Sequence, residues 1–308
     1  MVFPPLDPEL RLRRLAPPAG RVRMVLDTDT YNEVDDQFAV VYGLLSPKKL
    51  SVEALYAAPF HNNRSMGPGD GMERSYEEIL RLLARLDRDP EGFVFRGATR
   101  YLESPETPAD SEAVQDLIAR AMSRDDEPLY VVAIGAITNV ASAMLLEPRI
   151  IERIVVVWLG GHGLHWPDTV EFNLKQDPAA ARVILDSGVP FVHIGCMGVT
   201  SHLTTTVPEL EAYVAGRGAI GDYLVEVVKG YSEDHRAWAK EIWDISAVAW
   251  LVDGPGMTPG RIVPSPVLTG ELKWALDPAR HPVFDALYVD RNRIFRDLFD
   301  KLDAHAKR

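Results

Sequence analysis

From residue 21 onward the sequence alternates short runs of β-branched and aliphatic residues with longer amphipathic segments, which restricts the chain to few folds. Strand-like runs occur at residues 22–26, 52–58, 93–96, 129–134, 154–159 and 191–194. Apolar residues recur at helical spacing between them, most clearly Ile79, Leu82, Leu83 and Leu86. Because strand–helix–strand crossovers are right-handed, this series predicts an α/β fold with a mainly parallel central sheet and helices on both faces, a Rossmann-like arrangement.

The last third of the chain has a different pattern. After Thr200 we predict helices at residues 207–214, 221–240, 244–252 and 293–304. A Gly/Pro-rich stretch at 254–260 and short strand-like segments interrupt them. We interpret this part as a helical C-terminal elaboration packed on the sheet. Residues 1–20 contain several prolines and arginines and are predicted to be a flexible arm, which leaves a single domain over residues 21–308.

Composition excludes several classes of partner. Forty-five acidic and 33 basic residues give a net charge of −12, whereas a nucleic-acid-binding protein needs clustered Lys and Arg. No apolar stretch approaches the roughly 20 residues that span a bilayer. The single cysteine, Cys196, rules out an internal disulfide and a cysteine-rich metal cluster. We therefore expect a cytoplasmic protein that binds neither nucleic acid nor membranes.

Five carboxylates follow the first strand within ten residues. The apolar run ends at Leu26, and the acids that follow are Asp27, Asp29, Glu33, Asp35 and Asp36. In an open α/β sheet, ligands bind at the carboxyl ends of the strands, which is where this cluster falls. Carboxylates brought together there raise one another's pKa unless a cation neutralises them. Since only oxygen ligands are present, the cluster predicts a hard divalent cation, Ca²⁺ or Mg²⁺.

Two other interpretations compete with the metal site. In the first, Asp35 and Asp36 merely favour the positive N-terminus of a helix over residues 36–45, while Asp27 and Asp29 lie in a solvated turn. This accounts for two carboxylates more readily than for five.

The second alternative is a phosphatase of the haloacid-dehalogenase type, which also begins with a strand followed by Asp-x-Asp. That chemistry needs a later lysine and a second acidic pair at a strand end. The sequence offers Asp125-Asp126 only in a polar turn before a strand.

Three later segments carry polar residues where a strand ends or a helix begins. They are AIGAITNVASAM at residues 133–144, GGHGLHWPDTVEFNLKQDPAAA at 160–181 and EIWDISAVAWL at 241–251. Within them stand Thr138 and Asn139 at a helix start, Glu171 and Asn173 on a loop, Asp177 as a helix cap, and Trp243 and Asp244 before an apolar helix. Taken singly, each has an ordinary structural explanation as a cap or a core residue.

Together with DTDTYNEVDD after the first strand, the order and spacing of these segments resemble the inosine/uridine-preferring nucleoside hydrolase family. The resemblance runs from about residue 21 to residue 252 and covers most of the chain. It implies hydrolysis of the N-glycosidic bond of ribonucleosides to free base and ribose, a role in purine salvage, and a homodimer or homotetramer.

The resemblance also implies particular roles. Ca²⁺ would be held by Asp29, Asp36, the backbone carbonyl of Thr138, and Asp244, and Asp29 would also accept a proton from the attacking water. The sugar would be held by Asp35, by Glu171 and Asn173 at its far hydroxyl, and by Asn62 or Asn63 after the second strand.

The sequence departs from the family pattern at three places. Five residues, 30–34, separate the second aspartate from the Asp pair instead of three, which brings Glu33 near the site. Trp243 stands where many pyrimidine-accepting members have a histidine. Tryptophan cannot protonate a leaving base but can stack on one, so it favours purines. His165 occupies a position where an asparagine is expected to bind ribose, and we list it among the sugar contacts.

Several assignments stay open. His61, His162 and His165 are candidates for the acid that assists the leaving base, and each is equally explained as a polar surface residue. Trp166 and Trp238 could line the base pocket or the core. The remaining alternatives are a related glycoside hydrolase and a non-catalytic, metal-dependent sugar-binding protein of the same fold. The excess of negative charge favours a nucleoside over a nucleotide.

Overall fold

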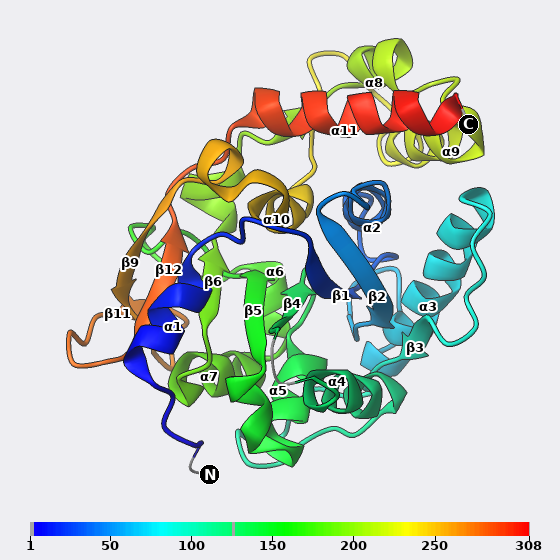
Figure 1. The fold of residues 1–308 in the computed structure, drawn as a ribbon. Helices are drawn as coiled ribbons and strands as arrows, with labels where there is room; N and C mark the ends of the chain where they lie inside the picture. The colour runs from blue at the N-terminus through cyan, green and yellow to red at the C-terminus, as the bar shows by residue number, and fades with distance from the viewer. Residues whose placement is uncertain (1–2, 125–126, 308) are drawn as a thin grey trace.

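A computed structural model of the protein describes residues 3–124 and 127–307 (Figure 1). Its centre is an eight-stranded sheet with the order β3-β2-β1-β4-β5-β6-β12-β9. The strands are β1 (Val22–Thr28), β2 (Leu50–Ala57), β3 (Val94–Arg96), β4 (Leu129–Ala133), β5 (Ile154–Leu159), β6 (Phe191–Ile194), β9 (Gly260–Pro264) and β12 (Pro282–Ala286). All neighbours pair in parallel except β9 and β12, which confirms the mainly parallel sheet.

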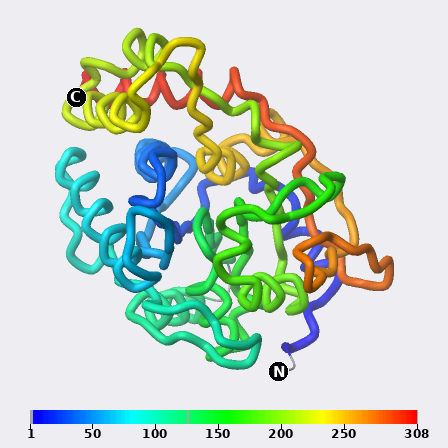
Figure 2. Tube along the Cα trace, turned by 180° about the vertical axis from the view of Figure 1, so that it is seen from behind, coloured from blue at the N-terminus to red at the C-terminus, as the bar shows by residue number. Residues whose placement is uncertain are grey.

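Helices cover both faces of the sheet, as predicted (Figure 1). One face carries α4 (Glu112–Met122), α5 (Thr138–Leu146) and α7 (Pro178–Ser187). The other face carries α2 (Asp36–Leu44) and α10 (Ile245–Met257), and outside these lie α8 (Val207–Tyr213), α9 (Gly218–Lys229) and α11 (Arg291–Ala306). The helix α3 (Pro68–Arg85) flanks the β3 edge. From behind, the two chain ends lie on opposite sides of the molecule (Figure 2).

Short elements complete the chain around this frame. They are α1 (Pro8–Leu15), α6 (Phe172–Gln176), the 3-10 helix η1 (Pro148–Glu152), the irregular turn η2 (Cys196–Thr200), and two antiparallel pairs, β7 (Thr204–Thr205) with β8 (Lys240–Glu241) and β10 (Val267–Leu268) with β11 (Trp274–Ala275). In the described part of the chain, none of the helices is both long and apolar enough to cross a membrane.

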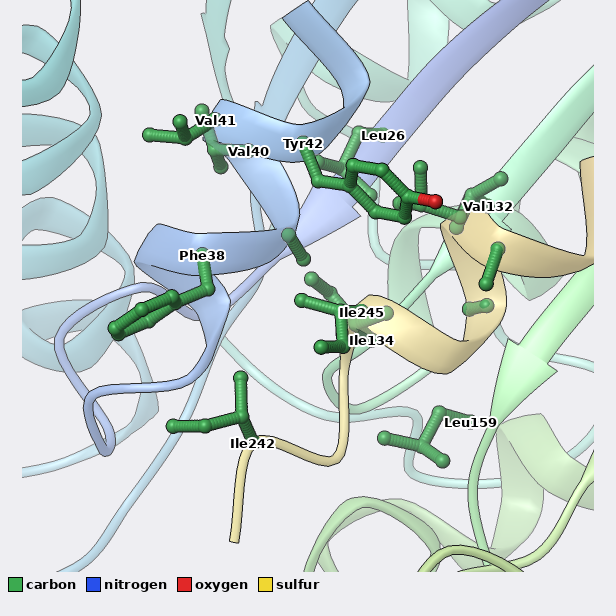
Figure 3. Packing of buried hydrophobic residues seen from close by; sticks show 14 of the residues in the cluster. Leu26, Phe38, Val40, Val41, Tyr42, Val132, Ile134, Leu159, Ile242 and Ile245 are labelled. Carbon is green, nitrogen blue, oxygen red and sulfur yellow. The ribbon is translucent and has the colours of Figure 1, made fainter. Parts of the chain in front are cut away.

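The apolar core has two parts, one on each side of the sheet. One contains residues of α2, α10, α9 and α11, and the other contains residues of α4, α5 and α7. Figure 3 shows a portion of the first, where Leu26 of β1, Phe38 of α2 and Ile245 of α10 lie in one apolar cluster. Strands buried on both faces need continuous rather than alternating apolar residues, which explains the uninterrupted runs in the sequence.

One prediction about the C-terminal third was wrong. The helix predicted at 221–240 ends at Lys229, because the chain then turns back to form β8 at Lys240. The predicted strand-like segments after the Gly/Pro-rich stretch include β9 and β12, which extend the central sheet. The β12 strand is buried over most of its length and pairs in parallel with β6.

The N-terminal segment contains a helix that the sequence did not suggest. In α1, Leu15 is buried in the core, and Arg11 and Arg14 donate hydrogen bonds to the backbone carbonyls of Gly188 and Glu152. These contacts hold the segment against the domain. The mobility of residues 1–20 and the single domain over 21–308 stay predictions.

The strand order places a binding site at the end of β1. From β1 the sheet extends in one direction to β2 and β3 and in the other to β4, β5 and β6. The connections therefore diverge to opposite sides of the point between β1 and β4. In folds of this kind, the carboxyl ends of the strands at such a point border a crevice where ligands bind.

Candidate active site

The acidic residues after β1 converge at this crevice. Asp29 directly follows β1, Asp35 and Asp36 begin α2, and Asp244 precedes α10. Carboxylate oxygens of Asp35, Asp36 and Asp244 all lie within 4.8 Å of one another. The solvated turn considered for Asp27 and Asp29 is wrong, because neither side chain is exposed.

Hydrogen bonds fix some of these carboxylates and leave others free. Asp36 accepts from the Thr28 hydroxyl and, at 3.1 Å, from the backbone N–H of Asp29. Asp27 accepts from Asn139 Nδ2 at 2.7 Å through one oxygen. Within the described chain, both carboxylate oxygens of Asp29 are buried without a hydrogen-bond partner. A buried, unpaired carboxylate is costly, so this one is suited to a ligand.

Burial is the main cause of unusual acidities in the cluster. It raises the pKa of Asp36 to about 8 and that of Asp27 to about 7. The pKa values of Asp29 and Asp244 are raised well above the ordinary range by burial and by neighbouring carboxylates. A bound cation removes this conflict, and a set of hard oxygen donors around an unpaired carboxylate fits a divalent metal ion.

Lys240 is the charged residue beside the cluster that sequence reasoning missed. Its ammonium lies 2.6 Å from Glu33 Oε2 and donates to the Glu241 carbonyl at 3.0 Å, and the side chain is buried. Burial raises the pKa of Asp35 to about 6, and the positive charge of Lys240 opposes that rise. Glu33 is thus paired with a cation, which explains how the longer loop tolerates another acid near the site.

Glu171 and Asn173 form a second, acceptor-rich wall. Glu171 caps α6 by accepting from the backbone N–H groups of Gly161, Asn173 and Leu174. The Asn173 amide donates to the carbonyls of Ile134 and Leu159, both at 3.0 Å. Its two hydrogens are therefore used, so only its oxygen remains for a ligand. Both residues stand at a short helix, where the sequence predicted a loop.

Thr138 and Asp177 are joined by a hydrogen bond at the start of α5. Thr138 begins α5 and donates through its hydroxyl to Asp177 at 2.7 Å. Asp177 also caps α7 by accepting from Ala180 N–H, as predicted. Thr138 is not among the described residues that line the cavity, so its role as a metal ligand stays a prediction.

These elements enclose a cavity of about 240 Å³. Its buried floor consists of Asp35, Asp36, Ile134, Leu159, Glu171, Asn173, Cys196 and Asp244. Its partly exposed rim consists of Asn32, Glu33, His162, Val170, Phe172, Met197 and Trp243. Four of the five carboxylates lie on the floor, whereas the rim carries Val170, Phe172, Met197 and Trp243 besides Asn32, Glu33 and His162. The buried part of the cavity is therefore the more acidic, and the rim is the more apolar and aromatic.

Several residues proposed from the sequence lie elsewhere. Asn62 donates to Asn32 at 2.8 Å and thereby supports the rim indirectly, and Asn63 is exposed. His165 is exposed and lies over Gly163 and Gly198. Their roles stay predictions.

The other aromatic candidates also lie away from the described lining. His61 is exposed, Trp166 is 36% exposed, and Trp238 stacks on Tyr231 with ring centres 6.5 Å apart. Of the candidate histidines, His162 lies on the rim.

Comparison with known proteins identifies the family of this chain. The family described as inosine-uridine preferring nucleoside hydrolase matches residues 24–283. The chain belongs to this family and is a hydrolase acting on N-glycosyl bonds. The dehalogenase-type phosphatase is thereby set aside, and Asp125-Asp126 lie outside the described residues.

Two of the relatives carry the same pyrimidine-specific name. The pyrimidine-specific ribonucleoside hydrolase RihA of Salmonella paratyphi A is 27% identical over 258 residues, covering 74% of this chain and 79% of that protein. The RihA protein of Escherichia coli O1:K1 matches with the same identity and coverage.

Two solved structures share the fold. A plant nucleoside hydrolase superposes with a TM-score of 0.73 at 23% identity, covering 93% of this chain and all of that one. A purine-preferring ribonucleoside hydrolase from Gardnerella vaginalis gives 0.72 at 23% identity, covering 92% and 99%.

Proposed function

We propose that the protein is a Ca²⁺-dependent ribonucleoside hydrolase that acts on unphosphorylated nucleosides. The observation that carries this proposal is the buried carboxylate cluster at the end of β1, with the unpaired Asp29 beside it. Asp29, Asp36, the Thr138 carbonyl and Asp244 are the proposed ligands. Bound Ca²⁺ would supply a fixed positive charge that orders the ribose diol and a water molecule.

The protein's own residues would carry the remaining chemistry. The C1′–N bond breaks with its electron pair leaving on the base, and the sugar acquires positive charge. The carboxylates of the floor stabilise this charge in a site shielded from water. Asp29 takes a proton from the water whose oxygen bonds to C1′. Asp35 accepts from a ribose hydroxyl, and Glu171 and Asn173 accept from the far hydroxyl.

The lining of the cavity favours a nucleoside over a nucleotide. Of the described residues around it, five are carboxylates and none is lysine or arginine. A phosphate would therefore face several carboxylates without a lysine or arginine in this lining to pair with. We expect nucleoside 5′-monophosphates to be poor substrates.

The base preference rests on Trp243. This half-buried side chain lies on the rim, where its indole can stack on a planar base, and a larger base gains more from stacking. We propose a preference for purines on this ground. The pyrimidine-specific name of the RihA relatives makes uridine and cytidine the necessary comparison.

A substrate panel tests these points. Purine nucleosides, pyrimidine nucleosides, their 5′-monophosphates and simple glycosides are incubated with the protein and Ca²⁺, and released base or sugar is measured. We expect free base from nucleosides, fastest from inosine or guanosine. Faster release from uridine refutes the purine preference, and release from glycosides alone favours a related glycoside hydrolase. Tight ribonucleoside binding without any base release indicates a sugar-binding protein.

Assembly and location remain predictions from the family resemblance and composition. We expect a homodimer or homotetramer in the cytoplasm, with a role in purine salvage. Light scattering coupled to size-exclusion chromatography measures the number of subunits directly.

A further inference from the structure

His162 occupies a rigid position on the rim of the cavity. Its backbone N–H donates to the Thr169 hydroxyl at 2.9 Å, and its carbonyl accepts from Trp274 Nε1 at 2.9 Å. The preceding residue, Gly161, has a φ of +73°, and a side chain there would collide with Thr169 and Trp274. The turn therefore holds the His162 backbone fixed by contacts on both sides.

A neighbouring strand end fixes the imidazole ring as well. The segment at Gly161 and Gly163 pairs with Cys196 and Met197 through backbone hydrogen bonds of 2.9 and 3.0 Å. The Met197 N–H then points at His162 Nδ1, 3.2 Å away. A backbone N–H can only donate, so Nδ1 must carry its lone pair and the ring proton must be on Nε2.

The ring is thus held as a neutral imidazole with one donor to offer. If Nδ1 were protonated, its N–H would face the backbone N–H of Met197, and the two donors would repel each other. Burial also lowers the pKa of His162. The negative charge of Asp168 opposes this decrease, and the nearby His193 adds to it. Among the described residues, none accepts a hydrogen bond from Nε2.

The position of His162 relative to the rest of the cavity points to its partner. The hydroxyl-rich sugar suits the buried floor of carboxylates, which leaves the flat base for the partly exposed rim. We infer that His162, through Nε2–H, donates a hydrogen bond to an acceptor nitrogen or oxygen on the leaving base while remaining neutral. Negative charge grows on the base as the C1′–N bond breaks, so this hydrogen bond strengthens in the transition state. His162 keeps its proton throughout, and the departing base is protonated by solvent.

This assignment differs from a general acid in two measurable ways. A neutral donor contributes roughly tenfold to the rate, whereas a general acid contributes about 10²–10⁴-fold. A general acid also produces a descending limb in the rate as it loses its proton. Other titratable groups also lie near the imidazole: five carboxylates line the cavity (Glu33, Asp35, Asp36, Glu171 and Asp244), and Asp168 and His193 both affect the pKa of His162. The comparison is therefore made between His162 variants.

The experiment compares two substrates and three variants. His162→Phe removes the donor and keeps an aromatic ring, and His162→Gln retains an N–H donor. His305→Phe is the control, because this partly exposed histidine on α11 lies away from the described lining of the cavity. Each is assayed with inosine and with 4-nitrophenyl β-D-ribofuranoside, whose leaving group needs little assistance.

We expect His162→Phe to lower kcat/KM for inosine about tenfold and for the aryl riboside less than twofold. His162→Gln should recover most of the loss, with a pH profile from 5.5 to 8.5 of wild-type shape. An equal loss on both substrates, no loss on inosine, or loss of a descending limb in the Gln variant overturns the inference. This inference rests on the proposed function. A wild-type protein that cleaves neither substrate overturns both the proposed function and the inference. An active wild-type protein whose activity is unchanged by His162→Phe overturns the inference alone.

Discussion

The Glu33–Lys240 pair supports a quantitative stability prediction. Replacing Lys240 by Met keeps most of the aliphatic stem but removes the charge. The Lys240 side chain is 5% exposed, so Glu33 and Asp35 would be left without their cation in a largely dry setting. Removing one partner of a fully buried pair costs about 3–5 kcal/mol. Because the Glu33 side chain is 33% exposed and water can partly solvate it, we expect about 2 kcal/mol.

Urea unfolding in EDTA at pH 7.5 measures this loss, with the slope of the transition checked for constancy. Lys273→Met is the matched control, since its ion pair with Glu271 is exposed at both ends and should contribute less than about 0.5 kcal/mol. The double variant with Glu33→Gln should be less destabilised than the sum of the single changes. A Lys240→Met protein as stable as the Lys273→Met control refutes the reasoning.

Three further outcomes follow from the site. Asp36→Asn should abolish Ca²⁺-induced stabilisation in a thermal melt, while a variant that keeps the shift shows that the ion binds elsewhere. In EDTA, the raised pKa values of Asp36 (about 8), Asp27 (about 7) and Asp35 (about 6) mean that the folded state holds more protons than the unfolded chain. The free energy of unfolding should therefore fall as the pH rises from 5 to 8, and a rise measured by urea titration contradicts this. Trp243→Ala should reduce the transition-state stabilisation of inosine, measured from kcat/KM, by about 1–3 kcal/mol. An unchanged kcat/KM rules out stacking.

The inner strands of the sheet were predictable because they are buried on both faces. Continuous apolar runs such as the one at β5 are unusual outside parallel sheets, and they indicated β1, β4, β5 and β6. The β12 strand was harder to assign, because its five residues include a proline and a buried aspartate. Asp285 Oδ1 lies 3.0 Å from His193 Nδ1 on the neighbouring strand. The residues next to Asp285 in the sequence do not indicate this distant partner.

The end of α9 shows how tertiary contacts override local pattern. The sequence predicts a helix that continues to Lys240, whereas α9 ends at Lys229. In the fold, Tyr231 and Lys240 both contact Glu33, on the long loop after β1. The sequence contains no sign of a pairing between residues 33 and 240, so Lys240 was missed.

The acidic part of the site was predictable and its neutral part was only partly so. Five carboxylates in ten residues have few structural explanations; four of them are buried, and the fifth, Glu33, lines the cavity. Rim residues such as Asn32 and Met197 have ordinary local surroundings in the sequence. They reach the cavity only because β1 and β6 end at the same edge of the sheet.

The central claim is that the buried carboxylate cluster and a divalent cation together cleave the bond between ribose and base. The most direct measurement is release of free base from inosine and uridine by wild-type protein and by Asp29→Asn, each with Ca²⁺ and with EDTA. Asp234→Asn, at an exposed ion pair, serves as the control. We predict base release by the wild type and the control in Ca²⁺, loss of activity in EDTA, and at least about a 10²-fold loss in Asp29→Asn. Undiminished release in EDTA or by Asp29→Asn would contradict the account.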